Sequence, residues 1–483
     1  MMTKCARVDN LFRRGEPAVA RRGIHFDLKG LPPTATRFME LLRCAAVARF
    51  NVVLVEWEDM FPWRCDTRLQ GPTAYSPEDV RNFCREAEAL GLELIPLVQT
   101  LGHMETVLRL PGRESLRELP HDPYTINPLA DGAAGLVRAM IRDVLDGMPG
   151  LRHFHLGADE AWSMGLHPQT RAYMAEHGKA GLFRHHLDPL LGEVIARGVR
   201  PVLWHDMFID LPQTDLAALG RQADLMVWGY GVHPDVTDLH YNTKYIRRFH
   251  DAGVPLWGAT ACKGAGGFSS DLPDLRARGE NAAHWMDIHT RFGLAGIVST
   301  AWSRYSTDNL QCEPMDAALD SMLYSGIILH DGAAPEGGVE ACREAAGCLP
   351  GGTAFAACRA VMERMARLRT AGWAAAQMLH EHVTLAEHDA RRRATLPCSS
   401  LRDMRRVVQD AAMLEQDIHR AFAGLIAPCW IESYCTERLA PLRDICRAFE
   451  PRVRAIVPPA VWDFEEVNHH RPLLERAAAG AGT

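Results

Sequence analysis

The stretch RHFHLGADE, residues 152–160, decides the fold because it reads as a buried strand that ends in two carboxylates. Side chains alternate along a strand, so Phe154 and Leu156 share one face while Asp159 lies on the other. A strand that ends here lets both Asp159 and Glu160 reach a cleft. Adjacent carboxylates repel and resist desolvation, so the pair predicts a cleft or a reaction site. A helix N-cap with a helix-dipole partner is the alternative interpretation.

Seven further stretches have the apolar character of buried parallel strands, and amphipathic segments separate them. Between two of them, Ser76 is a natural N-cap, Pro77 takes the first helical position and Gly91 closes the helix. Eight strand-helix units predict an α/β fold, a (β/α)8 TIM barrel, and a doubly wound open sheet is the alternative. The strands are expected at 23–30, 51–61, 92–104, 152–160, 200–208, 224–230, 254–264 and 294–305.

The length of 483 residues predicts more than one structural unit, since single cores stop growing at about 250–300 residues. We expect an N-terminal tail over 1–20, the catalytic barrel over 21–332 and an α-helical region over 333–483. The last region is rich in Ala, Arg and Leu at helical spacing. We interpret it as a packing or dimerisation unit, which leaves a homodimer open.

The composition is that of an ordinary globular protein, with 47% hydrophobic and 23% charged residues. A net charge of -7 argues against nucleic acid as a partner. The thirteen cysteines are scattered and odd in number, so neither disulfides nor a structural zinc site is expected. No apolar run resembles a signal peptide or a membrane span. We therefore expect a cytoplasmic protein with no membrane partner, no cofactor and no metal.

Polar and aromatic residues gather at the expected carboxyl ends of the strands, where TIM barrels build their active sites. They are Asp27, Lys29, Glu58, Asp59, Gln99, His103, Asp159, Glu160, His205, Asp206, Trp228, Tyr230, Lys263, Trp302 and Arg304. Four of the eleven tryptophans, Trp204, Trp228, Trp257 and Trp302, lie at or near the ends of strands five to eight. Indoles there offer flat apolar walls that suit the face of a sugar ring. The alternative is that they fill gaps under loops.

Several motifs resemble a known family. HLGADE, residues 155–160, resembles the H-x-G-x-D-E signature of glycoside hydrolase family 20, the β-N-acetylhexosaminidases. RGIHFDLKGLPP, VEWEDMFPW, PLVQTLGHME and AWSRY are most similar to the hexosaminidase D branch. The resemblance covers roughly residues 20–330 with the motifs in the family's order.

The resemblance implies a retaining exo-β-N-acetylhexosaminidase that removes terminal non-reducing β-GlcNAc or β-GalNAc from a glycan by substrate-assisted catalysis. The acetamido oxygen would attack the anomeric carbon, so no protein nucleophile is needed. Asp159 would orient the acetamido group and stabilise the oxazolinium intermediate, and Glu160 would act as acid and then base. Like-charge repulsion would raise one pKa of the pair and favour a neutral acid beside an ionised partner.

The resemblance also implies roles for further residues. Arg22 would bind ring hydroxyls, although the strand count places it before the first strand. Glu58 or Asp59 would pair with His103 to support the acid. The pocket would be formed by Trp204, Trp228 and Trp302, with His205 and Asp206 at its edge. Tyr230, or else Tyr305, would bond the acetamido carbonyl, and Arg304 stands where many family members have glutamate.

Two other functions remain open at this stage. A metal-dependent barrel hydrolase would need ligands from among His25, Asp27, Glu58, His103, His155, Asp159 and His205. HFD at 25–27 replaces the H-x-H expected for zinc amidohydrolases, which argues against it. A non-catalytic sugar-binding barrel would gain nothing from a buried pair of like charges. The family resemblance favours the glycosidase.

Overall fold

The computed structural model describes residues 6–456 apart from 268–269, 305, 308, 390 and 392–397. Eight parallel strands close into a barrel in the order β1-β10-β9-β8-β7-β6-β3-β2, so β1 pairs with both β2 and β10. The predicted TIM barrel is confirmed, and the open sheet is excluded. The barrel strands are β1 (Arg22–Asp27), β2 (Val52–Glu56), β3 (Glu93–Leu97), β6 (His153–His155), β7 (Arg200–Trp204), β8 (Asp224–Trp228), β9 (Leu256–Lys263) and β10 (Gly296–Ala301).

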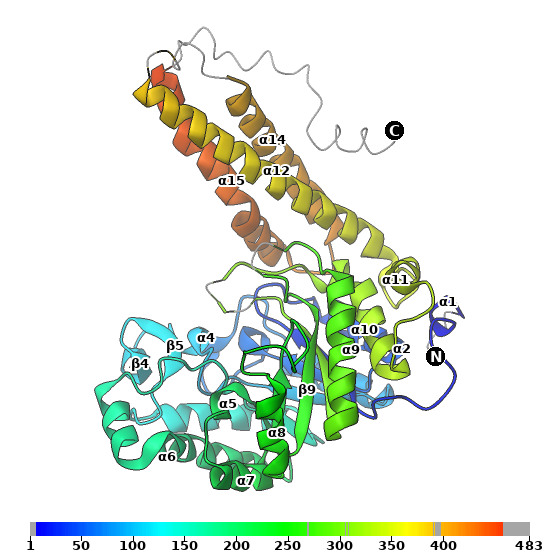
Figure 1. Ribbon diagram of the computed structural model, residues 1–483, viewed down its shortest axis with the longest axis vertical. Coiled ribbons are helices and arrows are strands. Elements are labelled where there is room, and N and C mark those ends of the chain that lie inside the picture. Colours follow the sequence, from blue (N-terminus) through cyan, green and yellow to red (C-terminus); the bar gives the residue numbers. More distant parts are fainter. Residues whose placement is uncertain are drawn as a thin grey trace.

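A ring of helices surrounds the barrel and buries the apolar outer faces of the strands (Figure 1). Its second member starts as the sequence predicts, with a capping box between Ser76 and Asp79 and with Pro77 in the first turn. The helices are α2 (Ala35–Val47), α3 (Pro77–Ala89), α5 (Ala133–Gly147), α6 (Pro168–Ile195), α7 (Gln213–Gln222), α8 (Thr243–Asp251), α9 (Leu275–Phe292) and α10 (Leu319–Asp331).

Short elements fill the connections, and one of them was not predicted. Between β3 and α5 the chain forms α4 (Glu105–Leu108) and an antiparallel hairpin of β4 (Arg117–Leu119) and β5 (Asp122–Ile126). The short 3-10 helices are η1 (Glu58–Met60), η2 (Thr67–Leu69), η3 (Glu114–Leu116), η4 (Asp206–Phe208), η5 (Met315–Ala317) and η6 (Gly352–Ala354). The hairpin, η1 and η4 carry side chains toward the carboxyl end of the barrel.

The N-terminal segment packs against the barrel rather than extending from it. It contains α1 (Ala6–Asp9), and its Val8 and Val19 are fully buried. The backbone N–H of Arg13 donates to Asp331 at the end of α10. At the other end of the barrel domain, α11 (Gly338–Ala346) packs on α10 and α1. Residues 333–354 therefore still belong to the outer layer of the barrel.

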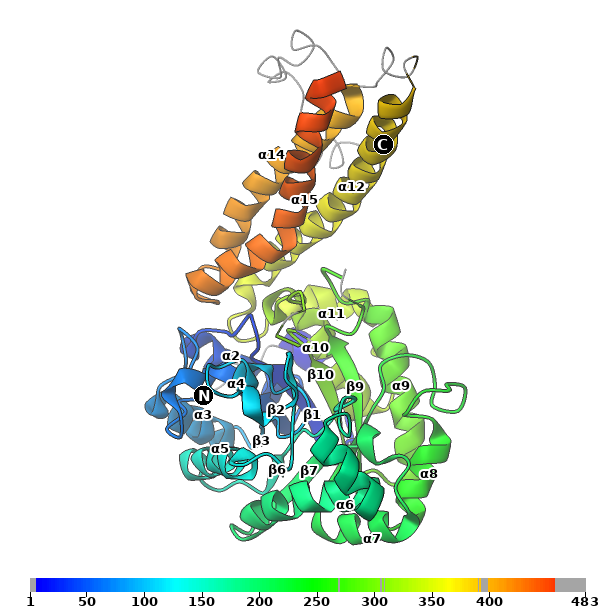
Figure 2. The same cartoon turned by 90° about the vertical axis from the view of Figure 1, so that its left-hand side faces the viewer.

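Three long helices form a bundle that projects from the barrel (Figures 1 and 2). They are α12 (Phe355–His388), α14 (Cys398–Ala421) and α15 (Pro428–Ile456), packed around their own apolar core. Ion pairs tie the helices together, such as Arg364–Asp417 and Arg452–Glu387. The predicted helical C-terminal region is present, and its residues 457–483 lie outside the described chain. Among the described residues, no helix combines the length and apolarity that a bilayer crossing requires.

The base of the bundle rests on the loops at the carboxyl end of the barrel. The backbone N–H of Thr34, in the loop after β1, donates to Leu425 O at 2.8 Å. Trp430 Nε1 donates to Thr73 Oγ1 at 2.6 Å in the loop after β2. Arg304, in the loop after β10, forms a close ion pair with Glu437 of α15. The helical region is thus connected to the loops that surround the barrel mouth.

Candidate active site

The loop after β6 delivers both acids of the HLGADE stretch to the carboxyl end of the barrel. The strand ends at His155, earlier than the sequence predicts, and the backbone then turns through left-handed conformations. Gly157 has φ of 61°, Ala158 of 69° and Glu160 of 49°. Such angles are rare and costly for residues other than glycine, and they cluster at functional sites. This irregular backbone lets adjacent residues point into one cavity.

A cavity of about 240 Å³ opens at this end of the barrel, and Asp159 and Glu160 both line it. Its other lining residues are Lys29, Glu56, Gln99, His103, Trp204, Trp228, Tyr230 and Trp302. The structure thus brings together both predicted acids, the predicted His103, Tyr230 and three of the four predicted tryptophans. The volume is suited to a single sugar ring rather than to an extended chain.

His103 lies between the two acids and contacts both. Its Nε2 is 3.3 Å from Asp159 Oδ2 and 3.3 Å from Glu160 Oε2. The hydroxyl of Tyr124, on β5, is 2.8 Å from His103 Nε2 and donates to Glu160 Oε2 at 3.4 Å. The Asp159 side chain is almost fully buried, whereas that of Glu160 is 34% exposed. Glu160 is therefore the acid that faces the cavity mouth.

The protonation of this cluster differs from the expected neutral acid beside an ionised partner. Burial alone would lower the pKa of His103, but the charge of Asp159 and hydrogen bonds to both acids raise it well above its usual value. Burial alone would raise the pKa of Glu160, but the hydrogen bond and charge of His103 lower it. In the unliganded cavity both shifts favour a protonated His103 and an ionised Glu160, the opposite of the expected neutral acid.

Asp206 stands directly behind the acid pair. Its Oδ2 accepts the backbone N–H of Glu160 at 2.8 Å, and its Oδ1 accepts Trp228 Nε1–H at 3.0 Å. Burial and the negative charge of Asp159 raise the pKa of Asp206 to about 7. His205 is fully buried, and its Nδ1 accepts the backbone N–H of Trp228 at 3.4 Å. Both residues support the wall from behind rather than forming its edge.

A buried lysine forms the floor on the opposite side. Lys29 Nζ lies 3.1 Å from Asp27 Oδ1, 2.5 Å from Glu56 Oε1 and 3.9 Å from Glu58 Oε1. Burial alone would lower the pKa of Lys29, but these carboxylates raise it. Burial and the charge of Glu56 raise the pKa of Glu58 to about 8, although Lys29 opposes the shift. Lys29 Nζ also lies 5.7 Å from the ring centre of Trp302, within cation–π range.

Aromatic rings form the remaining walls. Trp228 and Tyr230 stack with ring centres 5.5 Å apart, and Tyr230 meets Trp302 edge-on at 6.4 Å. Trp204 is fully buried beneath them, 6.2 Å from Trp302. Within the described residues, Nε1 of both Trp204 and Trp302 is buried without a hydrogen-bond partner. These walls offer an apolar surface with unused N–H donors.

Two predicted pocket residues lie at the opposite, amino end of the barrel. Arg22 starts β1, and its guanidinium donates to the carbonyl oxygens of Val19, Ala20 and Arg49 at 2.6–3.1 Å. Trp257 lies near the start of β9, where its Nε1 donates to Asp224 Oδ2 at 3.0 Å. The assignments of Arg22 and Trp257 to the pocket are therefore wrong, because both residues are at the beginnings of their strands.

Three further predicted residues lie near the cavity without lining it. Glu58 accepts a hydrogen bond from the Thr106 hydroxyl at 2.8 Å. Asp59 packs so closely against Gly71 that a Cβ atom added to this glycine would lie 2.5 Å from Asp59 Oδ2. In the described chain His103 forms its ion pairs with Asp159 and Glu160, so the expected pairing with Glu58 or Asp59 is wrong. Arg304 points toward Glu437 instead. Tyr305 lies outside the described residues.

Sequence reasoning missed part of the site. Lys29 and Gln99 were recognised as strand-end groups without a role, and Glu56 and Tyr124 were not recognised. For Glu56 a signal existed, because a carboxylate in the buried run VVLVE requires a partner. For Tyr124 there was none, since nothing local predicts that the β4–β5 hairpin folds over the acids. Its contact with Glu160 is a product of tertiary structure.

The seven residues considered as metal ligands do not converge. Within the described residues, the His, Cys, Asp and Glu groups close enough to share one ion are Glu415 with His419 and Cys435, and His233 with Asp235 and Asp287. Neither group lines the cavity. What meets in the cavity is an acid pair, a bridging histidine, a lysine and aromatic walls. At the carboxyl end of a TIM barrel, this arrangement is compatible with the carboxyl-based chemistry of glycoside hydrolases.

Comparison with known proteins gives the family. Residues 45–240 match the catalytic domain of glycosyl hydrolase family 20. The chain is 33% identical to bovine Hexosaminidase D over 312 residues, 62% of this chain and 89% of the relative. It is 34% identical to human Hexosaminidase D over 319 residues, 64% of this chain and 65% of the relative. The chain belongs to glycosyl hydrolase family 20.

A solved structure supports the fold. The chitobiase of Flavobacterium johnsoniae superposes with a TM-score of 0.53 at 13% identity, covering 91% of this chain and 72% of that one. At this identity the likeness is one of fold alone. Family membership makes the protein a glycoside hydrolase, so the alternatives of a metal-dependent barrel hydrolase of another class and a non-catalytic barrel are set aside.

Proposed function

We propose that this protein is a retaining exo-β-N-acetylhexosaminidase that removes terminal non-reducing β-GlcNAc or β-GalNAc with help from the substrate's acetamido group. The observation that carries the proposal is the state of Asp159. Its Oδ2 contacts His103, while its Oδ1 is buried without a hydrogen-bond partner among the described residues. Asp159 lines the cavity, and a buried acceptor without a partner is costly unless a ligand satisfies it. An acetamido N–H has the required donor.

In the first step, the acetamido oxygen attacks the anomeric carbon and the glycosidic bond breaks. Asp159 accepts the acetamido N–H and stabilises the positive charge of the oxazolinium ring that forms. The leaving oxygen needs a proton, which Glu160 donates. Glu160 receives this proton from His103: a bound sugar covers the exposed part of the carboxylate, and its desolvation favours the protonated form.

In the second step, Glu160 acts as the base. A water molecule loses a proton to Glu160 and attacks the anomeric carbon, which reopens the oxazolinium ring and restores the acetamido group. Because each attack inverts the configuration at the anomeric carbon, the two steps together retain it. Asp206 holds the backbone of Glu160 through its N–H, so it acts as a positioning residue for both steps.

The other cavity residues orient the sugar. Lys29 lines the cavity, and we propose that it donates to ring hydroxyls, a role that the family resemblance implied for Arg22. Trp302 and Trp228 pack against the apolar face of the ring. Tyr230 lines the same cavity and is the residue we propose for the acetamido carbonyl. The cytoplasm is the compartment we propose, because buried cysteines of the described chain such as Cys262 and Cys358 form no disulfide.

The test compares two substrates that differ only in the acetamido group. The full-length protein should release nitrophenol from nitrophenyl β-N-acetylglucosaminide or β-N-acetylgalactosaminide, without added metal. It should not turn over nitrophenyl β-glucoside, which lacks the internal nucleophile. Equal turnover of the two classes would contradict the assisted mechanism while leaving a glycosidase in place.

A further inference from the structure

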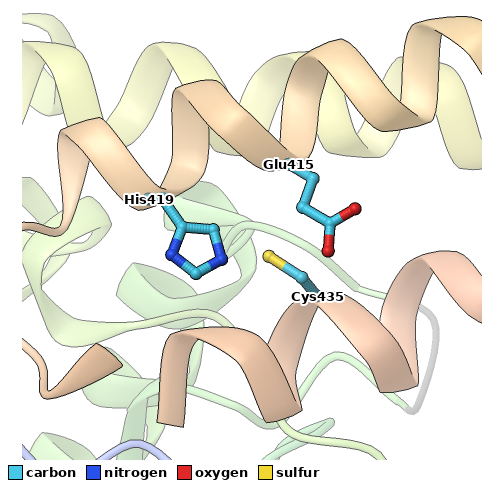
Figure 3. Close-up of side chains that lie close together, drawn as sticks. All are labelled: Glu415, His419 and Cys435. Carbon is cyan, nitrogen blue, oxygen red and sulfur yellow. The ribbon is translucent and has the colours of Figure 1, made fainter. Parts of the chain in front are cut away.

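A second group of chemically active side chains lies in the helical bundle, away from the cavity. Glu415 and His419 are four residues apart on α14, so they share one face of that helix. Cys435 faces them from α15. Figure 3 shows the three side chains pointing into the space between the two helices. One ligand atom of each lies within 4.8 Å of the other two.

We propose that Glu415, His419 and Cys435 form a zinc site that joins α14 to α15. A thiolate, an imidazole and a carboxylate are the three ligand types that Zn²⁺ takes in proteins. In a tetrahedral site with bonds of about 2.0–2.3 Å, ligand atoms lie about 3.5 Å apart. The observed spacing requires only a small closure of three side chains. A water molecule would complete the coordination.

The surroundings suit a bound cation. Cys435 is fully buried, whereas Glu415 and His419 are half-buried and leave an approach from solvent. Arg443 forms a close ion pair with Glu415 through Oε2. That pairing orients the carboxylate and leaves Oε1 for the metal, as hydrogen-bonded carboxylate ligands do in other metal sites. The site thus has three ligands, one supporting contact and an entry path.

The position of the site gives it a structural purpose. The chain between the two helices turns at residues 422–427, close to the barrel mouth. Glu415 and His419 lie in the last two turns of α14, just before this turn of the chain, and Cys435 lies after the turn on α15. A metal bound there fixes the start of α15, the helix whose Glu437 contacts Arg304. The ion would stabilise the base of the bundle against the barrel.

The other metal-like group in the described chain does not qualify. His233, Asp235 and Asp287 lie on the surface, and the two carboxylates are exposed. Arg291 donates to both of these aspartates at 2.8–3.0 Å. This set is therefore a solvated ion-pair network in which the cation is already supplied by the protein.

The experiment uses the full-length protein after removal of metal with a chelator and dialysis. Titration with Co²⁺ should produce a thiolate-to-cobalt charge-transfer band that saturates at one equivalent and disappears when Zn²⁺ is added. Cys435→Ser and His419→Gln should abolish or strongly weaken the band. Cys429→Ser is the matched control, because Cys429 is an exposed thiol six residues away on the same helix, and it should keep the band.

A second readout covers the case that a variant folds poorly. Zn²⁺ should raise the melting temperature of the wild-type protein and of Cys429→Ser, and should leave that of His419→Gln unchanged. Circular dichroism establishes that the variant keeps its long helices, and retained glycosidase activity that it keeps its barrel, since none of these residues lines the cavity. Absence of a cobalt band in the wild-type protein, or a band that persists in Cys435→Ser, would overturn the proposal.

Discussion

The amino and carboxyl ends of the barrel contain similar polar residues but differ in how far those residues are paired with one another. At the amino end, charged groups satisfy one another: Glu93 Oε1 contacts His153 Nδ1 at 2.5 Å, and Arg200 contacts Asp224 at 2.8 Å. At the carboxyl end, Asp159 Oδ1 and the Nε1 groups of Trp204 and Trp302 are buried without partners in the described chain. Charged groups at the first end are paired in the free protein, and we propose that a ligand completes the second.

Backbone geometry follows the same division. Four of the five non-glycine residues with left-handed φ in the described chain follow strands at the carboxyl end: Glu58, His103, Ala158 and Glu160. The fifth, Arg49, precedes β2 at the amino end. Two of these four residues, His103 and Glu160, line the cavity, in keeping with the clustering of strained backbone at functional sites. The comparison predicts that substitutions at the carboxyl end change catalysis, whereas those at the amino end change stability.

The largest effect is expected at Glu160. Glu160→Gln removes the group proposed to protonate the leaving oxygen, so kcat should fall by about 10²- to 10⁴-fold on a disaccharide with a poor leaving group. The loss should be much smaller on a nitrophenyl glycoside, whose leaving group needs little protonation. Steady-state kinetics on both substrates measure the difference. Unchanged turnover of the disaccharide would remove Glu160 from the role of acid.

The next effect is expected at the buried cation. Lys29→Met removes the charge that balances Asp27 and Glu56 and the donor proposed for ring hydroxyls. We expect kcat/KM to fall by about 10- to 100-fold, since a charged hydrogen bond contributes about 1.5–3 kcal/mol. The free energy of unfolding should also fall, because two carboxylates remain buried without their partner. Lys244→Met, on the barrel surface, should change neither quantity.

The pH dependence of activity tests the role of His103. The charge of Asp159 and hydrogen bonds to both acids outweigh burial and raise its pKa well above 6.5, and we propose that it passes its proton to Glu160. Activity should therefore persist above pH 6.5 and decline only as pH rises through the pKa of His103 in the folded protein. In His103→Gln the alkaline limb of kcat/KM should move to lower pH, because the carboxyl alone loses its proton earlier. If the alkaline limb of kcat/KM does not move, a group other than His103 determines it.

A smaller effect is expected where the helical bundle meets the barrel mouth. Glu437→Gln breaks the ion pair with Arg304, which lies two residues after the wall residue Trp302. Partly exposed pairs contribute about 1 kcal/mol or less, so KM should rise only a few-fold while kcat stays close to its original value. Glu432→Gln, a neighbouring change on α15, is the matched control. An equal rise of KM in Glu437→Gln and Glu432→Gln would indicate a general loss of helix stability.

The smallest kinetic effect is expected at the amino end. Arg22→Gln removes hydrogen bonds to buried carbonyl oxygens, so the free energy of unfolding should fall by about 1–3 kcal/mol. The kcat/KM of the folded fraction should stay unchanged, because the guanidinium is remote from the cavity. Denaturant unfolding and initial rates measure the two quantities. A large fall in kcat/KM would contradict the division between a carboxyl end that serves catalysis and an amino end that serves stability.

The comparison also explains what the sequence could predict. Repeated apolar runs and helix caps define the eight units, so the barrel follows from local patterns. The acids are recognisable because a like-charge pair at a strand end needs a special environment. Arg22 was misplaced because the family resemblance assigned it to the pocket against a strand count that put it before the first strand, and Trp257 because its place near the start of the expected strand 254–264 was not used. A one-dimensional motif does not separate the two ends unless the strand limits are known.

Other features of the site depend on tertiary contacts. Tyr124 reaches Glu160 from a hairpin that has no local connection to the acids. The proton was expected on Glu160, but its location depends on His103, which is more than fifty residues away in the chain. Charge pairs between distant segments set such pKa values, and neither segment predicts them alone.

The most direct test of the account is a crystal structure of the full-length protein with the thiazoline analogue of the cyclised N-acetylglucosamine intermediate. The account predicts that the ring nitrogen of the thiazoline lies within hydrogen-bond distance of Asp159 Oδ1, with Glu160 facing the anomeric carbon. A thiazoline ring turned away from Asp159, or an analogue bound outside the cavity, would contradict it.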